Sequence, residues 1–152
     1  MSIKRITNPE EFGKVIDDLY SLFVDEDKHS GHRLLLHDPQ MIKNCFGHTS
    51  ILNWDFYCWA NKTSDSYDAI ICFINDKNPK FGEKIFSEFL WLSKNPKIGY
   101  KLFSTAMKFA RENEFKIVAM STVVQHPKHE KIKSFYNKMG FLKDSETYIA
   151  KL

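Results

Sequence analysis

The segment best suited to bind an anion is the junction Ser93-Lys94-Asn95-Pro96, which follows the apolar run at residues 84–92. Asn95 precedes a proline, so its backbone is kept out of the α region and fits the N-cap of a helix. Pro96 then takes the first helical position. We expect the backbone N–H groups of residues 97–99 to point out of this helix end, where the helix dipole favours negative charge.

Two lysines and a glycine strengthen this interpretation. Lys94 and Lys97 add mobile positive charge, and Gly99 would let a bulky group approach the backbone closely. The junction therefore predicts a pyrophosphate site at the end of a strand. The alternative is a plain capped helix start, because such junctions commonly bind nothing and two earlier helices of this chain are predicted to begin in the same way.

Glu88 is a second candidate for chemistry, because it is the only ionisable group in the run IFSEFLWL. With strict alternation it shares a face with Phe86, Leu90 and Leu92, where a carboxylate loses hydration. Its pKa should then rise towards a value useful for a general base. The alternatives are a buried Glu88 paired with a lysine or arginine, or a strand end turned to solvent.

The cysteines and histidines favour no metal site. Cys45, Cys58 and Cys72 lack metal-ligand spacing, and each lies in an apolar run that predicts a buried free thiol. Residues 25–37 read as a polar loop that carries three histidines and lacks the helix-based spacing of a zinc site. We interpret it as a solvated loop; the other hypothesis is that its histidines line a substrate pocket.

The whole composition is that of one globular domain spanning residues 1–152. The formal net charge of +3 is mildly basic, and the lysines and arginines are dispersed, which disfavours nucleic acid as a partner. The first residues lack the apolar stretch of a signal peptide, and no run approaches the length of a membrane span. A cytoplasmic protein that does not engage membranes is expected.

The elements that must position these residues follow from periodicity and caps. Asn8-Pro9 and Asp38-Pro39 predict two helix starts. Three strands at 50–60, 67–74 and 84–92 form an antiparallel meander, with Phe-rich apolar faces for an aromatic core. The order then continues as helix 97–112, strand 115–124, helix 128–139 ending at Gly140, and strand 146–152. Together these predict an α/β fold with a mixed sheet flanked by helices.

The late segment HEKIKSFYNKMGF, residues 129–141, carries a family resemblance. Its run Phe135-Tyr136-Asn137-Lys138-Met139-Gly140-Phe141 closely resembles the late helix motif of the GCN5-related N-acetyltransferases. The order of elements resembles that family over nearly the whole chain. Residue-level support lies in residues 85–141.

The resemblance implies that acetyl-CoA lies where strands 84–92 and 115–124 splay apart. In the coenzyme loop this chain departs from the family pattern, because Lys94 replaces Arg or Gln and Lys97 replaces the first Gly. The positions that the resemblance assigns to the coenzyme are Leu90, Trp91, Leu92, Lys94, Asn95, Lys97, Ile98, Gly99, Tyr100 and His129.

The resemblance also implies catalytic roles. Tyr136 matches the tyrosine that protonates the departing CoA thiolate, and Glu88 falls where some members place a base that deprotonates the amine. The alternatives are an aromatic on the inner face of a helix for Tyr136, and a surface histidine at a helix start for His129.

The implied activity is N-acetylation of a small-molecule or peptide amine by direct transfer from acetyl-CoA, without a metal. A homodimer through the final strand is a further expectation. The alternatives are a catalytically inactive module of the same fold that binds CoA or a partner, and an α/β domain that binds RNA or protein.

Overall fold

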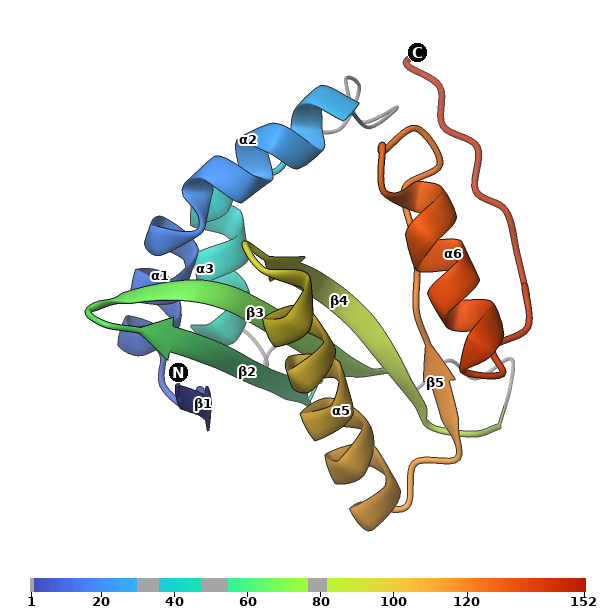
Figure 1. Cartoon of the computed structure of the whole chain (residues 1–152), viewed down its shortest axis with the longest axis horizontal. Helices are drawn as coiled ribbons and strands as arrows, with labels where there is room; N and C mark the ends of the chain where they lie inside the picture. Colours follow the sequence, from blue (N-terminus) through green and yellow to red (C-terminus); the bar gives the residue numbers. More distant parts are fainter. Residues whose placement is uncertain (1, 30–35, 48–54, 77–81) are drawn as a thin grey trace. The chain divides into compact units, whose positions relative to one another are not determined.

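The computed structural model describes residues 2–29, 36–47, 55–76 and 82–152 (Figure 1). It divides into two compact units. The first comprises residues 1–22 and 38–120, and the second comprises residues 23–37 and 121–152. Among the described residues, none of the helices is long and apolar enough to cross a membrane.

The first unit is built on a five-stranded sheet in the order β1-β2-β3-β4-β5. The strands are β1 (Ser2–Arg5), β2 (Phe56–Thr63), β3 (Ser66–Asp76), β4 (Ile85–Ser93) and β5 (Ile117–Ala119). β1 to β4 pair antiparallel, and β5 runs parallel to β4. The predicted mixed sheet and α/β class are therefore confirmed.

Helices cover both faces of this sheet. They are α1 (Pro9–Asp18), α3 (Pro39–Gly47) and α5 (Pro96–Glu112). The ring of Phe56 in β2 packs on the rings of Phe12 of α1 and Phe46 of α3, with centroid distances of 5.5 Å and 5.4 Å. The next residue, Tyr57, packs on Phe109 of α5 at 5.1 Å. Successive strand residues point to opposite faces, so α1 and α3 cover one face and α5 covers the other (Figure 1).

The core of the first unit is aromatic, as the composition predicts. Phe12, Phe73, Phe86 and Phe103 are buried to within 1% of full burial. Phe73 and Phe86 stack across β3 and β4 with centroids 4.1 Å apart. Large rings in this position remove much apolar surface from water on both faces of the sheet.

The predicted helix caps are confirmed in the first unit. The Asn8 side chain accepts a hydrogen bond from the Glu11 amide at 2.8 Å, and Asp38 accepts from the amides of Gln40 and Met41. Pro9 and Pro39 occupy the first helical positions of α1 and α3.

The second unit contains the end of α2 (Tyr20–His29) and α6 (His129–Lys138). Gly140 has φ of +85° directly after α6. Its amide donates to the Asn137 carbonyl at 3.2 Å, and the Phe141 amide donates to Tyr136 at 3.0 Å. These two bonds form a Schellman motif, with the Phe141 and Tyr136 rings 5.5 Å apart as its apolar contact. The predicted glycine cap is confirmed.

Three element predictions need correction. The loop expected from residue 25 is wrong up to His29, because α2 continues there and ends on Lys28 and His29, which suit a helix C-terminus. The strand expected at 115–124 is shorter than predicted, because only β5 (Ile117–Ala119) forms there. The strand expected at 146–152 does not form. Tyr148 is 86% exposed, so the apolar side chains of this segment gain no burial from packing as a strand. Residues 50–54 of the first meander strand lie outside the described residues.

Candidate functional site

The edge of β4 is the backbone feature that the first unit offers to a ligand. β4 pairs with β3 from Ile85 to Ser93, but with β5 only from Ile85 to Ser87. In the described part of the sheet, the pairing of β4 with β5 thus ends at Ser87, and residues 88–93 of β4 continue beyond it. A backbone edge of this kind can accept an extended ligand through its N–H and C=O groups. Leu90, Trp91 and Leu92 lie in this stretch.

The start of α5 follows directly after that edge. Asn95 caps the helix by accepting from the Lys97 amide at 2.9 Å. Ser93 Oγ accepts from the Asn95 amide at 3.1 Å and donates to the Asn95 carbonyl at 2.5 Å. Lys94 and Lys97 are exposed on either side of the cap. The predicted cap and the predicted cationic surroundings are both present.

The expectation that the amides of residues 97–99 all point outwards is wrong. The Lys97 amide is taken by the Asn95 side chain, and the Gly99 amide donates to the Asn95 carbonyl at 3.0 Å. Helix geometry assigns no backbone partner to the third helical residue, so in this turn the Ile98 amide is the donor suited to an outside acceptor.

Gly99 has a different role from the one predicted. It is buried, and a Cβ added there would lie 3.2 Å from Ser93 Cβ and 3.6 Å from Trp91 Nε1. The Trp91 indole N–H donates to the Gly99 carbonyl at 3.2 Å. The missing side chain therefore lets α5 pack closely on β4, and the space beside it belongs to the protein. Tyr100, the next residue, is 49% exposed.

Glu88 lies at an irregularity of β4. It pairs with Phe73, while Cys72 pairs with Leu90, so a bulge occurs between the two positions. Phe86 packs on Phe73, on the face of the sheet that α5 covers. Leu90 pairs with Cys72 and lies on the opposite face of the sheet. The predicted single face for Phe86, Glu88, Leu90 and Leu92 is therefore wrong, because a bulge breaks the alternation. Glu88 is half-buried. The pKa of the Cys72 thiol is raised mainly by burial, then by the contact with Cys58, and the charge of Glu88 adds to the same shift.

In the second unit, Tyr136 is buried on α6 with 9% of its surface exposed. Its hydroxyl donates to the Ser121 carbonyl at 2.7 Å, and its ring lies 5.9 Å from that of Phe135. A phenol that donates to a carbonyl is oriented, and it can redirect its proton to a stronger acceptor. Its role as an acid stays a prediction.

His129 begins α6 and has its own partner, because Nδ1 lies 3.2 Å from Thr122 Oγ1. Sequence reasoning missed the neighbouring His126, which is buried at 9% exposure. Its Nδ1 accepts from the Lys128 amide at 3.1 Å, and its Nε2 lies 3.5 Å from Glu26. No periodic pattern marks this position, because the burial of His126 depends on a segment far away in sequence.

Two of the three histidines predicted in residues 25–37 have carboxylate partners in the second unit. His29 lies 3.7 Å from Asp25 at the end of α2, and His37 Nδ1 lies 2.6 Å from Asp27. His32 falls outside the described residues. In the ranges that the structure describes, no three His, Cys, Asp or Glu side chains are placed to hold a metal ion.

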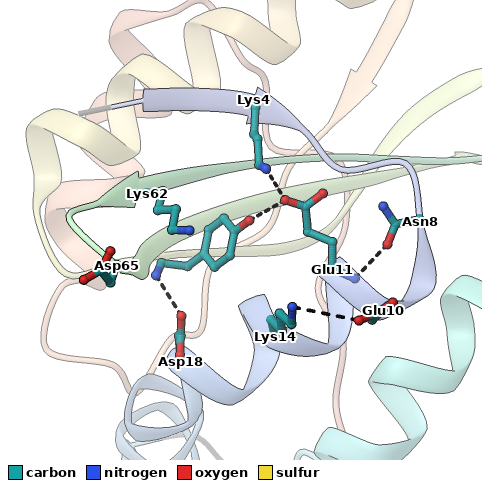
Figure 2. Close-up of a pocket in the computed structure, with 9 residues that line it drawn as sticks. Lys4, Asn8, Glu10, Glu11, Lys14, Asp18, Lys62 and Asp65 are labelled. Atoms are coloured by element: carbon teal, nitrogen blue, oxygen red, sulfur yellow. Dashed lines mark hydrogen bonds and ion pairs between the residues drawn. The ribbon is translucent and has the colours of Figure 1, made fainter.

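A charged pocket of about 430 Å³ in the first unit was also missed (Figure 2). Tyr67 lies in it, with its hydroxyl donating to Glu11 Oε1 at 2.5 Å and its amide donating to Asp18 at 2.9 Å. Glu11 also pairs with Lys4, which holds the pKa of the Glu11 carboxyl below its ordinary value. The lining residues are Lys4, Asn8, Glu10, Glu11, Lys14, Asp18, Lys62, Asp65 and Tyr67. Its charges are of both signs and pair largely with each other.

Comparison with known proteins places the fold. No protein-family model matches the chain, and no curated protein matches its sequence. Among solved structures, the chain resembles an aminoglycoside acetyltransferase from an uncultured soil metagenomic sample in complex with sisomicin. That likeness has a TM-score of 0.69 at 11% identity and covers 99% of this chain and 96% of the other.

Two further structures extend this likeness. A ribosomal-protein-alanine N-acetyltransferase from Brucella melitensis matches with a TM-score of 0.66 at 10% identity, over 99% of this chain and 98% of the other. A predicted acetyltransferase with acetyl-CoA from Clostridium acetobutylicum matches with a TM-score of 0.67 at 10% identity, over 99% and 95%. The chain therefore has the acetyltransferase fold that the resemblance to the GCN5-related enzymes implied.

Proposed function

We propose that this protein is an N-acetyltransferase that transfers an acetyl group directly from acetyl-CoA to an amine. The observation that carries the proposal is the stretch of β4 at residues 88–93, which lies beyond the end of the β4–β5 pairing and leads straight into the capped and cationic start of α5. An extended arm can pair with the edge, while a phosphate group meets the Ile98 amide and the charges of Lys94 and Lys97.

The chemistry needs two proton movements and a fixed geometry. The amine nitrogen attacks the thioester carbonyl carbon, the C–S bond breaks as the tetrahedral intermediate collapses, and the sulfur takes a proton. In this proposal Tyr136 gives that proton, and Glu88, directly or through water, takes the proton lost by the amine. Holding both reactants together supplies most of the acceleration.

Calorimetry with acetyl-CoA tests the binding half of this proposal. Lys97→Glu places a negative charge at the first turn of α5 and should weaken binding by about tenfold or more. Lys101→Glu makes the same change in net charge one turn further along α5, where the dipole has faded, and should change affinity much less. Equal effects of the two variants, or no binding to the unmodified protein, would remove the α5 site.

The second candidate is a catalytically inactive module that binds CoA or a partner protein. It is favoured by the start of α5, where the amides of Lys97 and Gly99 are both already bonded within the chain. Acetyl transfer tested over a panel of polyamine, amino-acid, aminoglycoside and peptide amines separates the two. Transfer to any of them supports the enzyme, and CoA binding without transfer supports the module.

The remaining expectations from the sequence stand as proposals. They are a small-molecule or peptide acceptor, a cytoplasmic location, independence of nucleic acid and membranes, one domain over residues 1–152 and a possible homodimer.

A further inference from the structure

Two of the three cysteines face each other inside the sheet of the first unit. Cys58 of β2 and Cys72 of β3 are cross-strand partners, and both are fully buried. Their Sγ atoms are 3.3 Å apart, and both are free thiols. Cys45, in α3, is only half-buried. The contact brings together two groups that can be oxidised as a pair.

The backbone geometry of this pair suits a covalent link. The Cys58 carbonyl accepts from the Ile6 amide at 2.9 Å, so the backbone polar groups of Cys58 point away from β3. Cys58 and Cys72 are therefore a non-hydrogen-bonded pair, in which Cα atoms are about 4.5 Å apart and side chains approach closely. This separation falls inside the range that disulfides span, and the sulfurs need to move together by only about 1.3 Å.

We propose that Cys58 and Cys72 are a modification site, where peroxide joins the two sulfurs in an intramolecular disulfide between β2 and β3. One thiolate attacks a peroxide oxygen, which gives a sulfenic acid and water. The neighbouring sulfur then attacks the sulfenic sulfur, the S–S bond forms, and the hydroxyl leaves as a second water. Two thiols are oxidised and one peroxide is reduced.

Burial makes this reaction slow rather than impossible. Loss of hydration raises the pKa of the Cys72 thiol well above its ordinary value, and the contact with Cys58 and the charge of Glu88 act in the same direction. The attacking thiolate therefore forms mainly when the sheet opens locally. Hydrogen peroxide is small enough to enter such an opening, whereas a bulky disulfide reagent is not.

The test uses a Cys45→Ser variant, so that Cys58 and Cys72 are the only thiols left. The folded variant is treated with excess hydrogen peroxide for several hours, unfolded in acid, alkylated and digested with trypsin without reductant. Cleavage after Lys43, Lys62 and Lys77 places Cys58 in peptide 44–62 and Cys72 in peptide 63–77. Neither peptide contains methionine, so oxygen added to methionine does not confuse their masses.

The expected result is a linked species of peptides 44–62 and 63–77, two hydrogen masses below their sum, in most of the sample. Reductant should separate it. Recovery of the two peptides unlinked, whether alkylated or carrying added oxygens, overturns the proposal. A Cys45→Ser, Cys72→Ala protein cannot form the link and serves as control. If that control does not fold, the untreated Cys45→Ser sample takes its place, and the linked peptide still decides. The readout is a covalent bond, so it does not depend on the proposed activity.

Discussion

Replacing Tyr136 by phenylalanine separates a catalytic role from a structural one. The change removes one hydroxyl, which donates to the carbonyl of the exposed Ser121 at 2.7 Å. Water can solvate that carbonyl in the variant, so the loss of stability should be about 1 kcal/mol. For a chain of this length, that corresponds to a melting temperature lower by about 2–4 °C.

The effect on turnover should be much larger if Tyr136 protonates the thiolate. Loss of a positioned general acid lowers kcat by about a hundredfold or more, which is at least about 2.7 kcal/mol of barrier. CoA affinity should stay within about twofold, since the phenol acts on the leaving sulfur. The assay follows release of the CoA thiol with the best acceptor amine, calorimetry gives affinity, and thermal unfolding gives stability.

Tyr67→Phe is the matched control. Tyr67 is also a buried tyrosine, at 4% exposure, and its hydroxyl donates to the carboxylate of Glu11. Its removal should cost about 1.5 kcal/mol or more of stability and leave kcat unchanged. If Tyr136→Phe lowers kcat no more than Tyr67→Phe does, or lowers affinity and kcat together, the acid role is wrong and Tyr136 is a core aromatic.

Two further predictions concern stability. The pKa of Glu11 is lowered by its bonds to Lys4 and then Tyr67, so ionised Glu11 stabilises the fold above the ordinary glutamate pKa, and this contribution is lost as pH falls through the lowered value. The difference in melting temperature between the unmodified protein and Glu11→Gln should thus be largest near neutral pH and should shrink as the pH falls below about 4. A difference that stays constant with pH contradicts this. Gly140→Ala meets no atom within 4 Å but forces alanine to φ of +85°, and should cost about 1 kcal/mol. Gly13→Ala, inside α1 with only Lys43 Cδ at 4.0 Å, should be neutral or stabilising by up to about 1 kcal/mol, and the opposite order in thermal unfolding would refute the argument.

Local signals in the sequence predicted much of this fold. The Asx-Pro pairs at Asn8, Asp38 and Asn95 each begin a helix, because the side chain satisfies an amide that the helix leaves unpaired. Gly140 ends α6 for an equally local reason, since few residues other than glycine adopt a positive φ. These features depend on neighbours within a few residues, so a single sequence contains them.

The candidate site was less predictable because its details depend on neighbours distant in sequence. The bulge beside Glu88 arises from the pairing of β4 with β3, and no residue type in β4 predicts it. The short β5 depends on where its pairing with β4 stops. Gly99 reads as ligand clearance in a linear pattern, but Ser93 and Trp91 occupy the space. The alternating pattern of residues 84–92 predicted the strand correctly, but it predicted only in part which face of the sheet each residue lies on.

Three sets of hydrogen bonds stabilise the junction between β4 and α5. Ser93 exchanges two hydrogen bonds with Asn95, Asn95 caps the helix, and Trp91 binds the Gly99 carbonyl. These bonds hold the strand edge and the helix start at a set spacing from each other. A ligand that binds as proposed, with a phosphate at α5 and an arm along β4, would therefore be selected for the length of its arm. An arm of one particular length would bring its far end to the same residue of β4 each time.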